Sequence, residues 1–269
     1  MNKLFNNILV PIDFTESSEL AIEKALDIAN HFKCNIHLLY AGGNRVKKQP
    51  VEIGEARLYR LQHRYTFRLH PGLSFHASVR KGNPNQVVIE YALRHNIDLV
   101  VIGRQQGLLR EVIKGRFNSS EITKRIECPV LTVRKNNGND KWMNIVLPVC
   151  SVLPVRKIMF ASYLARKYNS KIHLLSIAEN ENEDDSNRNL YLSKAYQLLR
   201  DNTNLMIECH TIRGNNIADS TLRFAEKINA DLIVVNPGQE SRLPGFVNKL
   251  FDGSLFSESR IPVMTISVV

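Results

Sequence analysis

The stretch GNPNQVVIEYALRHNIDLVVIG, residues 82–103, has the signals of a helix followed at once by a buried strand. Asn83 is a favourable N-cap, Pro84 suits the first helical position, and Gln86 lies where a capping box needs its last residue. The run LVVIG at residues 99–103 has no polar alternation, which indicates a strand buried on both faces. A helix that leads into such a strand is typical of a parallel α/β sheet.

The residues before and after this stretch continue the alternation of strand and helix. Residues 15–32 place apolar side chains at helical spacing, and Thr15 or Ser17 can cap this helix. The remaining apolar runs are short and rich in branched residues, as strands are; with the run above they cover residues 7–12, 35–40, 74–79, 98–103 and 129–133. This pattern predicts βαβ units and a doubly wound sheet of five parallel strands.

The second half of the chain repeats the first. Four pairs of segments occur in the same order: NILVPID (7–13) with NIVLPVC (144–150), NIHLLY (35–40) with KIHLLS (171–176), NIDLVVIGR (96–104) with NADLIVVNP (229–237), and CPVLTV (128–133) with IPVMTI (261–266). We therefore expect two copies of one domain, at residues 1–134 and 142–269. The polar stretch at residues 134–143 is suited to a linker between them.

Composition argues against several classes of function. No apolar run approaches the roughly 20 residues of a membrane span, and the N-terminus has no signal-peptide core. The four cysteines are scattered, so we expect reduced thiols in a cytoplasmic protein without a membrane partner. The eight histidines are also dispersed and predict no metal site. His37 and His173 match in the repeat, which favours a structural role for both.

The net charge of +10 is concentrated in the first copy, where residues 1–134 contain 20 Lys and Arg against 12 Asp and Glu. A basic surface can bind nucleotides, nucleic acids or membranes. Here the charge is spread along the chain, and no nucleic-acid-binding module surrounds it. We therefore expect no specific nucleic-acid partner.

Three blocks of the chain resemble the universal stress protein family: ILVPIDFTESSELAIEKALDIA (8–29), GNPNQVVIEYALRHNIDLVVIG (82–103) and CPVLTV (128–133). The match covers nearly the whole chain and is similar to the tandem, two-domain members. The resemblance implies a Rossmann-like fold in each copy, of the adenine nucleotide alpha hydrolase type. It also implies a pseudo-dimer of the two copies through their last strands, and it allows a homodimer of whole chains.

Family members that bind ATP have an aspartate after the first strand and a loop of the form G-x2-G-x9-G-[S/T] after the fourth. Asp13 matches the aspartate, and Gly103 matches the first loop glycine. The other loop positions fall on Gln106, Arg116 and Phe117. The resemblance therefore implies an ATP site that has lost two glycines and a hydroxyl.

The candidate nucleotide-binding residues of the first copy lie in its first strand, just after it, or at the loop that follows the fourth strand. They are Pro11, Asp13, Gly103, Arg104, Gln106, Gly107, Gly115 and Arg116. The last two glycines enter through a shifted match to the loop, and the arginines can bind phosphate through their side chains. Asp13 has an alternative role, in which its carboxylate bonds to N–H groups at the start of a helix.

The second copy departs further from the family pattern. Cys150 stands where Asp13 stands in the first copy. A constant offset of 133 residues places no glycine at the loop positions, which fall on Asn236, Gln239, Lys249 and Leu250. ATP bound by the first copy is therefore the one cofactor that the resemblance suggests.

These features favour a non-catalytic tandem protein that acts in the stress response by binding a ligand or a protein partner. The alternative is a nucleotide-binding switch that uses Asp13 and the basic loop of the first copy. An enzyme has the least support, because no nucleophile, base and orienting group occur at suitable spacings. The segment PIDFTES (11–17) also lacks the glycines of an ATP pyrophosphatase loop.

Overall fold

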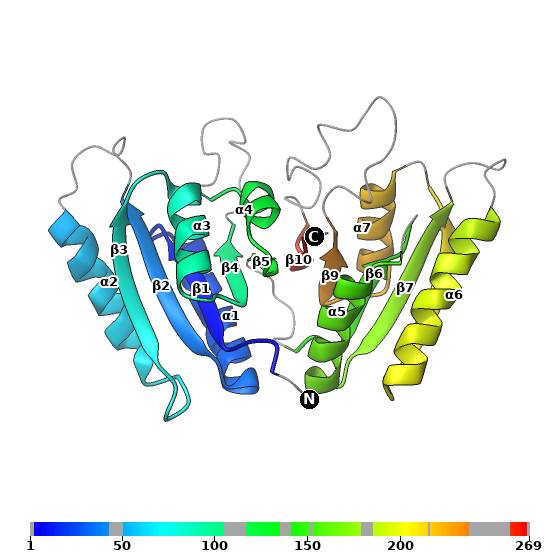
Figure 1. The fold of residues 1–269 in the computed structure, drawn as a ribbon, viewed down its shortest axis with the longest axis horizontal. Helices are drawn as coiled ribbons and strands as arrows, with labels where there is room; N and C mark the ends of the chain where they lie inside the picture. The colour runs from blue at the N-terminus through cyan, green and yellow to red at the C-terminus, as the bar shows by residue number, and fades with distance from the viewer. Residues whose placement is uncertain are drawn as a thin grey trace. The chain divides into compact units, whose positions relative to one another are not determined.

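The computed structural model describes residues 3–42, 51–104, 117–134, 141–150, 153–178, 185–214, 216–236 and 259–267. The chain divides into two compact units, Met1–Lys135 and Asn136–Val269. Each unit is an α/β structure (Figure 1). The pairing of the two copies through their last strands stays a prediction.

The first unit is a sheet of five parallel strands: β1 (Asn7–Ile12), β2 (Asn35–Gly42), β3 (Phe75–Lys81), β4 (Leu99–Gly103) and β5 (Val130–Val133). Their order is β3-β2-β1-β4-β5. The helices are α1 (Glu16–Phe32), α2 (Val51–Thr66), α3 (Pro84–Arg94) and α4 (Ser119–Arg125). The strand order reverses at β1, so the predicted doubly wound sheet is confirmed.

Helices cover both faces of this sheet (Figure 1). On one face, Val88 of α3 and Ile122 of α4 pack in one apolar cluster with Leu9, Leu39 and Val100 of the central strands. All five side chains are fully buried, as the unbroken apolar runs in the sequence predict. Helix α1 packs on the opposite face against β1 and β4.

The N-cap predicted at Asn83 is confirmed. Its Oδ1 accepts hydrogen bonds from the backbone N–H groups of Asn85 at 3.0 Å and Gln86 at 3.3 Å, and Pro84 occupies the first turn. The predicted capping box is wrong in its second half. The Gln86 side chain donates to Glu90 at 3.0 Å, one turn further along the exposed side of α3, instead of returning to the cap.

Replacing Asn83 with alanine should lower the free energy of unfolding by about 1 kcal/mol, because two N–H groups of the first turn lose their acceptor. Chemical denaturation measures this change. Gln86→Ala on the same turn is the matched control and should change stability by less than about 0.5 kcal/mol. Equal effects of the two substitutions would show that the cap contributes nothing.

The second unit repeats the first, with strands β6 (Asn144–Pro148), β7 (Lys171–Ala178), β8 (Ile207–Arg213), β9 (Leu232–Val235) and β10 (Val263–Thr265). Their order is β10-β9-β6-β7-β8, and all pair in parallel. The helices are α5 (Val155–Tyr168), α6 (Asp185–Asn202) and α7 (Ile217–Lys227). Asn216 caps α7 as Asn83 caps α3.

Across the described ranges, no helix combines the length and apolar character of a membrane span.

Candidate functional site

Asp13 follows β1 at the carboxyl end of the first sheet, the edge at which doubly wound folds bind ligands. Its Oδ1 accepts hydrogen bonds from both the backbone N–H and the hydroxyl of Thr15, at 3.1 and 2.5 Å. Thr15 is the N-cap of α1, so Asp13 holds the capping residue in place. Oδ2 has no hydrogen-bond partner in the described part of the chain.

Aromatic and basic side chains pack around the turn after Asp13. Phe14 has φ 62°, in the left-handed region that non-glycine residues rarely adopt. Its ring lies 4.7 Å from the ring of Tyr40, and the guanidinium of Arg57 lies 4.2 Å from its centre. This cation–π contact stabilises the turn. It also engages the guanidinium of Arg57, a residue of α2, within the first domain.

Gly103 and Pro11 have structural reasons for their positions. A Cβ atom on Gly103 would lie 1.7 Å from the carbonyl oxygen of Ser17, so the first turn of α1 contacts the end of β4 directly. The glycine is therefore required by helix–sheet packing. Pro11 is buried inside β1, in register with Leu39 of β2. Gly103 therefore has a packing role at the end of β4, whereas Pro11 is part of the β1–β2 pairing.

Arg104 is held by its own domain. Its backbone N–H donates to the Val133 carbonyl at 2.9 Å, and its Nη2 donates to the hydroxyl of Ser119 at 3.0 Å. Burial lowers the pKa of its guanidinium from the ordinary value. Phe117, where the family pattern needs a hydroxyl, is 6% exposed and lies in the apolar cluster under α3 and α4.

Four of the expected site residues cannot be placed relative to these. Gln106, Gly107, Gly115 and Arg116 lie outside the described residues. Of the eight candidates, the structure thus brings together the strand-end group of Pro11, Asp13, Gly103 and Arg104 at the carboxyl ends of β1 and β4, which are neighbours in the sheet.

The matching end of the second sheet has different chemistry. Cys150 follows β6 and is half-buried. Lys157 of α5 is 1% exposed, and its Nζ donates to the carbonyl of Pro148, the last residue of β6, at 2.5 Å. Asn236, at the position of Gly103, is buried and donates to the Ile266 carbonyl at 3.0 Å. A cysteine thus takes the place of Asp13, and a buried lysine of α5 bonds to the end of the strand.

His37 lies near the start of β2, far along the strand from Asp13, and is 8% exposed. Its Nδ1 lies 3.1 Å from the hydroxyl of Tyr91 on α3, and its ring lies 4.7 Å from the ring of His76 on β3. Burial lowers the pKa of His37 to about 4, and the neighbouring His76 and His95 act in the same direction. The imidazole is therefore neutral at physiological pH.

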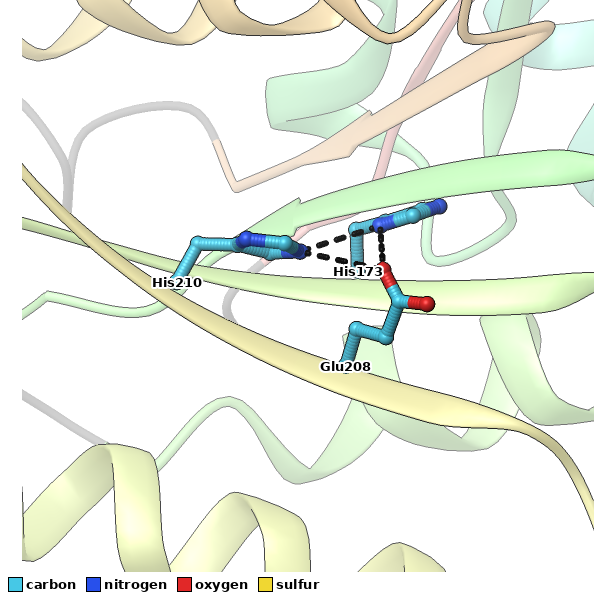
Figure 2. A group of neighbouring side chains, drawn as sticks. All are labelled: His173, Glu208 and His210. Carbon is cyan, nitrogen blue, oxygen red and sulfur yellow. Dashed lines mark hydrogen bonds and ion pairs between the residues drawn. The ribbon is translucent and has the colours of Figure 1, made fainter.

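His173, its counterpart on β7, belongs to a cluster that sequence reasoning missed. Glu208 and His210 of β8 point toward it from the neighbouring strand (Figure 2). Burial lowers the pKa of His173, and the negative charge of Glu208 opposes that shift. A hydrogen bond from Lys171 lowers the pKa of Glu208. The available signal was the spacing Glu-x-His, which places two ligand types on one face of a strand.

The two units define a tandem protein of the doubly wound α/β class, with its candidate site at the carboxyl ends of the strands. The model of the universal stress protein family matches residues 4–134. A universal stress protein of Methanocaldococcus jannaschii is 25% identical over 147 residues, which cover 49% of this chain and 84% of that protein. The first unit of the chain belongs to the universal stress protein family, whose model covers nearly all of it.

Solved structures with the same fold extend over both units. A universal stress protein from Archaeoglobus fulgidus DSM 4304 has a TM-score of 0.74 at 17% identity, covering 98% of each chain. A putative universal stress protein from Pseudomonas aeruginosa UCBPP-PA14 has a TM-score of 0.71 at 17% identity, covering 99% of this chain and 95% of that one. At this level of identity the likeness is one of fold.

Proposed function

We propose that this chain is a non-catalytic tandem universal stress protein that acts in the stress response by binding a ligand or a protein partner. In this proposal the ATP site of the first domain is degraded, and the second domain has none. The observation that carries it is Phe117, which stands where the family's ATP loop has a hydroxyl and is buried in the apolar core.

The expected loss of affinity follows from three substitutions in the loop pattern. Gln106 and Arg116 stand where glycines let the backbone approach phosphates, and a side chain in that conformation costs roughly 1–2 kcal/mol each. The missing hydroxyl at Phe117 removes a bond to a charged oxygen, worth about 1.5–3 kcal/mol. Together these weaken a micromolar site by about a hundredfold or more.

Contacts at the strand ends support the same conclusion. Arg104 already bonds to Ser119 through Nη2, so one of its side-chain nitrogens is engaged within the domain. Asp13 is bonded through Oδ1 to Thr15, and only Oδ2 remains for an adenine. In the second domain, Lys157 bonds to the end of β6 and Cys150 replaces the aspartate. These groups are engaged in holding the fold.

The nucleotide-binding switch is the second candidate, and Oδ2 of Asp13 is the observation that favours it. A carboxylate oxygen at the ligand-binding edge of a doubly wound sheet is well placed to accept a bond from a base. In this candidate the arginines near the loop bind the phosphates in place of glycine backbone. It differs from the first proposal in affinity and in its dependence on salt.

Calorimetric titration of the full chain with ATP, AMP and inorganic tripolyphosphate tests both candidates. We expect ATP to bind at about 100 μM or more weakly, and the affinity to fall as salt rises, because salt screens the attraction between phosphates and arginine side chains. Similar weak binding of all three compounds would leave only a basic patch at this edge.

Submicromolar, salt-resistant ATP binding that Asp13→Ala abolishes would overturn the proposal and establish the switch. Asp13→Asn is the matched control for folding, because its amide oxygen can still accept the bonds from Thr15. A native mass spectrum of the purified chain adds an independent readout, since a retained nucleotide would appear as added mass.

A further inference from the structure

His173, Glu208 and His210 bring three metal-binding atoms together in the second domain (Figure 2). His173 Nδ1 lies 3.1 Å from His210 Nε2 and 3.4 Å from Glu208 Oε2, and the last two atoms are 3.6 Å apart. Glu208 and His210 are alternate residues of β8, so they lie on the same face of the strand. His173 lies on β7, which pairs with β8 in parallel, and it is in register with Glu208.

These separations suit a tetrahedral ion. Ligand atoms around zinc, at bond lengths of about 2.0–2.1 Å, lie roughly 3.3–3.4 Å apart. The three distances in the cluster lie on either side of this value, so one ion fits all three atoms without movement of the strands. Two imidazoles and one carboxylate are a zinc ligand set, with water in the fourth position.

Neighbouring groups orient the ligands as a metal site requires. His173 Nε2 lies 3.2 Å from Asn144 Oδ1, an amide oxygen that accepts the proton of that nitrogen and leaves Nδ1 with its lone pair toward the cluster. Lys171 Nζ bonds to Glu208 Oε1 at 2.7 Å, which fixes the carboxylate and leaves Oε2 free to face the imidazoles. The positive charge of Lys171 disfavours a metal cation nearby. The negative charge of the Glu208 carboxylate, which lies between Lys171 and the proposed ion, offsets this repulsion.

The first domain provides an internal comparison, because its matching cluster cannot bind a metal in this way. His37 corresponds to His173, but its Nδ1 lies 3.1 Å from the hydroxyl of Tyr91. Phe224 is the counterpart of Tyr91 in the second domain and has no hydroxyl; its ring lies 4.7 Å from His210. The places of Glu208 and His210 are taken in the first domain by His76 and Ser78.

Solvent reaches the cluster from one side. The side chain of His173 is 5% exposed, whereas those of His210 and Glu208 are 27% and 45% exposed. A water ligand can therefore complete the coordination shell. Asn144 and Lys171 are the first residues of β6 and β7, so the cluster lies toward the amino ends of the strands, away from the nucleotide edge.

We propose that the second domain binds one zinc ion through His173 Nδ1, Glu208 Oε2 and His210 Nε2. The site is independent of the proposed function, because it uses the opposite end of the strands. A single shared proton is the competing explanation for the short distance between the two imidazoles. A shared proton between the imidazoles would not require the cluster to bind metal. Direct measurement of Zn²⁺ binding therefore separates the shared proton from the zinc site.

Titration of the metal-stripped full chain with Zn²⁺ against a chromophoric chelator should give one site per chain. Glu208→Gln and His210→Ser each remove a ligand and should weaken binding at least about 100-fold, since even outer groups of zinc sites contribute 10–100-fold. Serine is the residue at the matching position of the first domain, Ser78, so we expect the same fold to accommodate His210→Ser. Asn144→Ala, which removes only the orienting bond, should weaken binding by about tenfold or more.

His76→Ala in the first domain and Cys209→Ser beside the ligands are the matched controls, and both should leave the affinity unchanged. Co²⁺ should give the visible bands of a tetrahedral ion without a thiolate charge-transfer band. Circular dichroism checks that each variant is folded. Absence of stoichiometric Zn²⁺ binding, equal binding by wild type and His210→Ser, or a thiolate band that Cys209→Ser removes would overturn the proposal.

Discussion

Replacing Gly103 with alanine should lower the free energy of unfolding of the first domain by about 3 kcal/mol or more. The added methyl group would lie 1.7 Å from the carbonyl oxygen of Ser17, well inside any permitted contact. The obstacle is helix backbone, which a rotamer change cannot relieve, so α1 has to move away from β4. Overpacking of this kind costs typically 1–3 kcal/mol and more where the backbone is involved.

Chemical denaturation followed by two probes locates the effect. Far-ultraviolet circular dichroism follows both domains, whereas Trp142, the one tryptophan of the chain, is buried in the second. Gly42→Ala is the matched control, because its methyl group would meet Tyr40 and Arg80 only at 3.7 and 3.8 Å. If Gly103→Ala were as stable as Gly42→Ala, the close approach of α1 and β4 would be wrong.

Acidification should destabilise the first domain through His37 by about 2.5 kcal/mol between about pH 7.5 and pH 4.5. Burial lowers the pKa of His37 from its ordinary value of 6.5 to about 4 in the folded chain. Between these values the unfolded chain binds a proton that the folded chain excludes. The stabilisation is therefore complete above about pH 6.5 and is lost as the pH falls toward 4.

A nuclear magnetic resonance titration of the imidazole should give a pKa for His37 near 4. The dependence of the unfolding free energy on pH should become shallower in His37→Leu, because leucine fills the buried position with an apolar side chain that cannot titrate. His173→Leu is the matched variant of the second domain and should leave the His37 titration in place. A His37 pKa near 6.5 in the folded protein would contradict the prediction.

The fold was predictable because its signals are local. The cap at Asn83 and the unbroken run from Leu99 to Gly103 lie within one short segment, and the structure has the helix and strand they predict. The capping box failed at Gln86, because an exposed amide has Glu90 as an equally near partner. Local spacing cannot decide between two such partners.

The sites were less predictable because their contacts join distant residues. The sequence pattern places Gly103 in a phosphate loop, whereas the structure packs it against Ser17 of α1. His173 and His210 are separated by 37 positions, and they meet only through the register of β7 and β8. That register depends on how the whole sheet packs, which a single sequence does not display. The cluster of His173, Glu208 and His210 is therefore not evident from their spacing in the sequence.

Lys157 distinguishes the strand ends of the two domains. The first sheet ends in the carboxylate of Asp13, whereas the second has a lysine amine bonded to the carbonyl of Pro148. The strand ends of the two domains therefore carry different charged groups, so a ligand meets different chemistry at each. The duplicated strand ends are thus chemically distinct, and we do not expect one ligand to bind both in the same way.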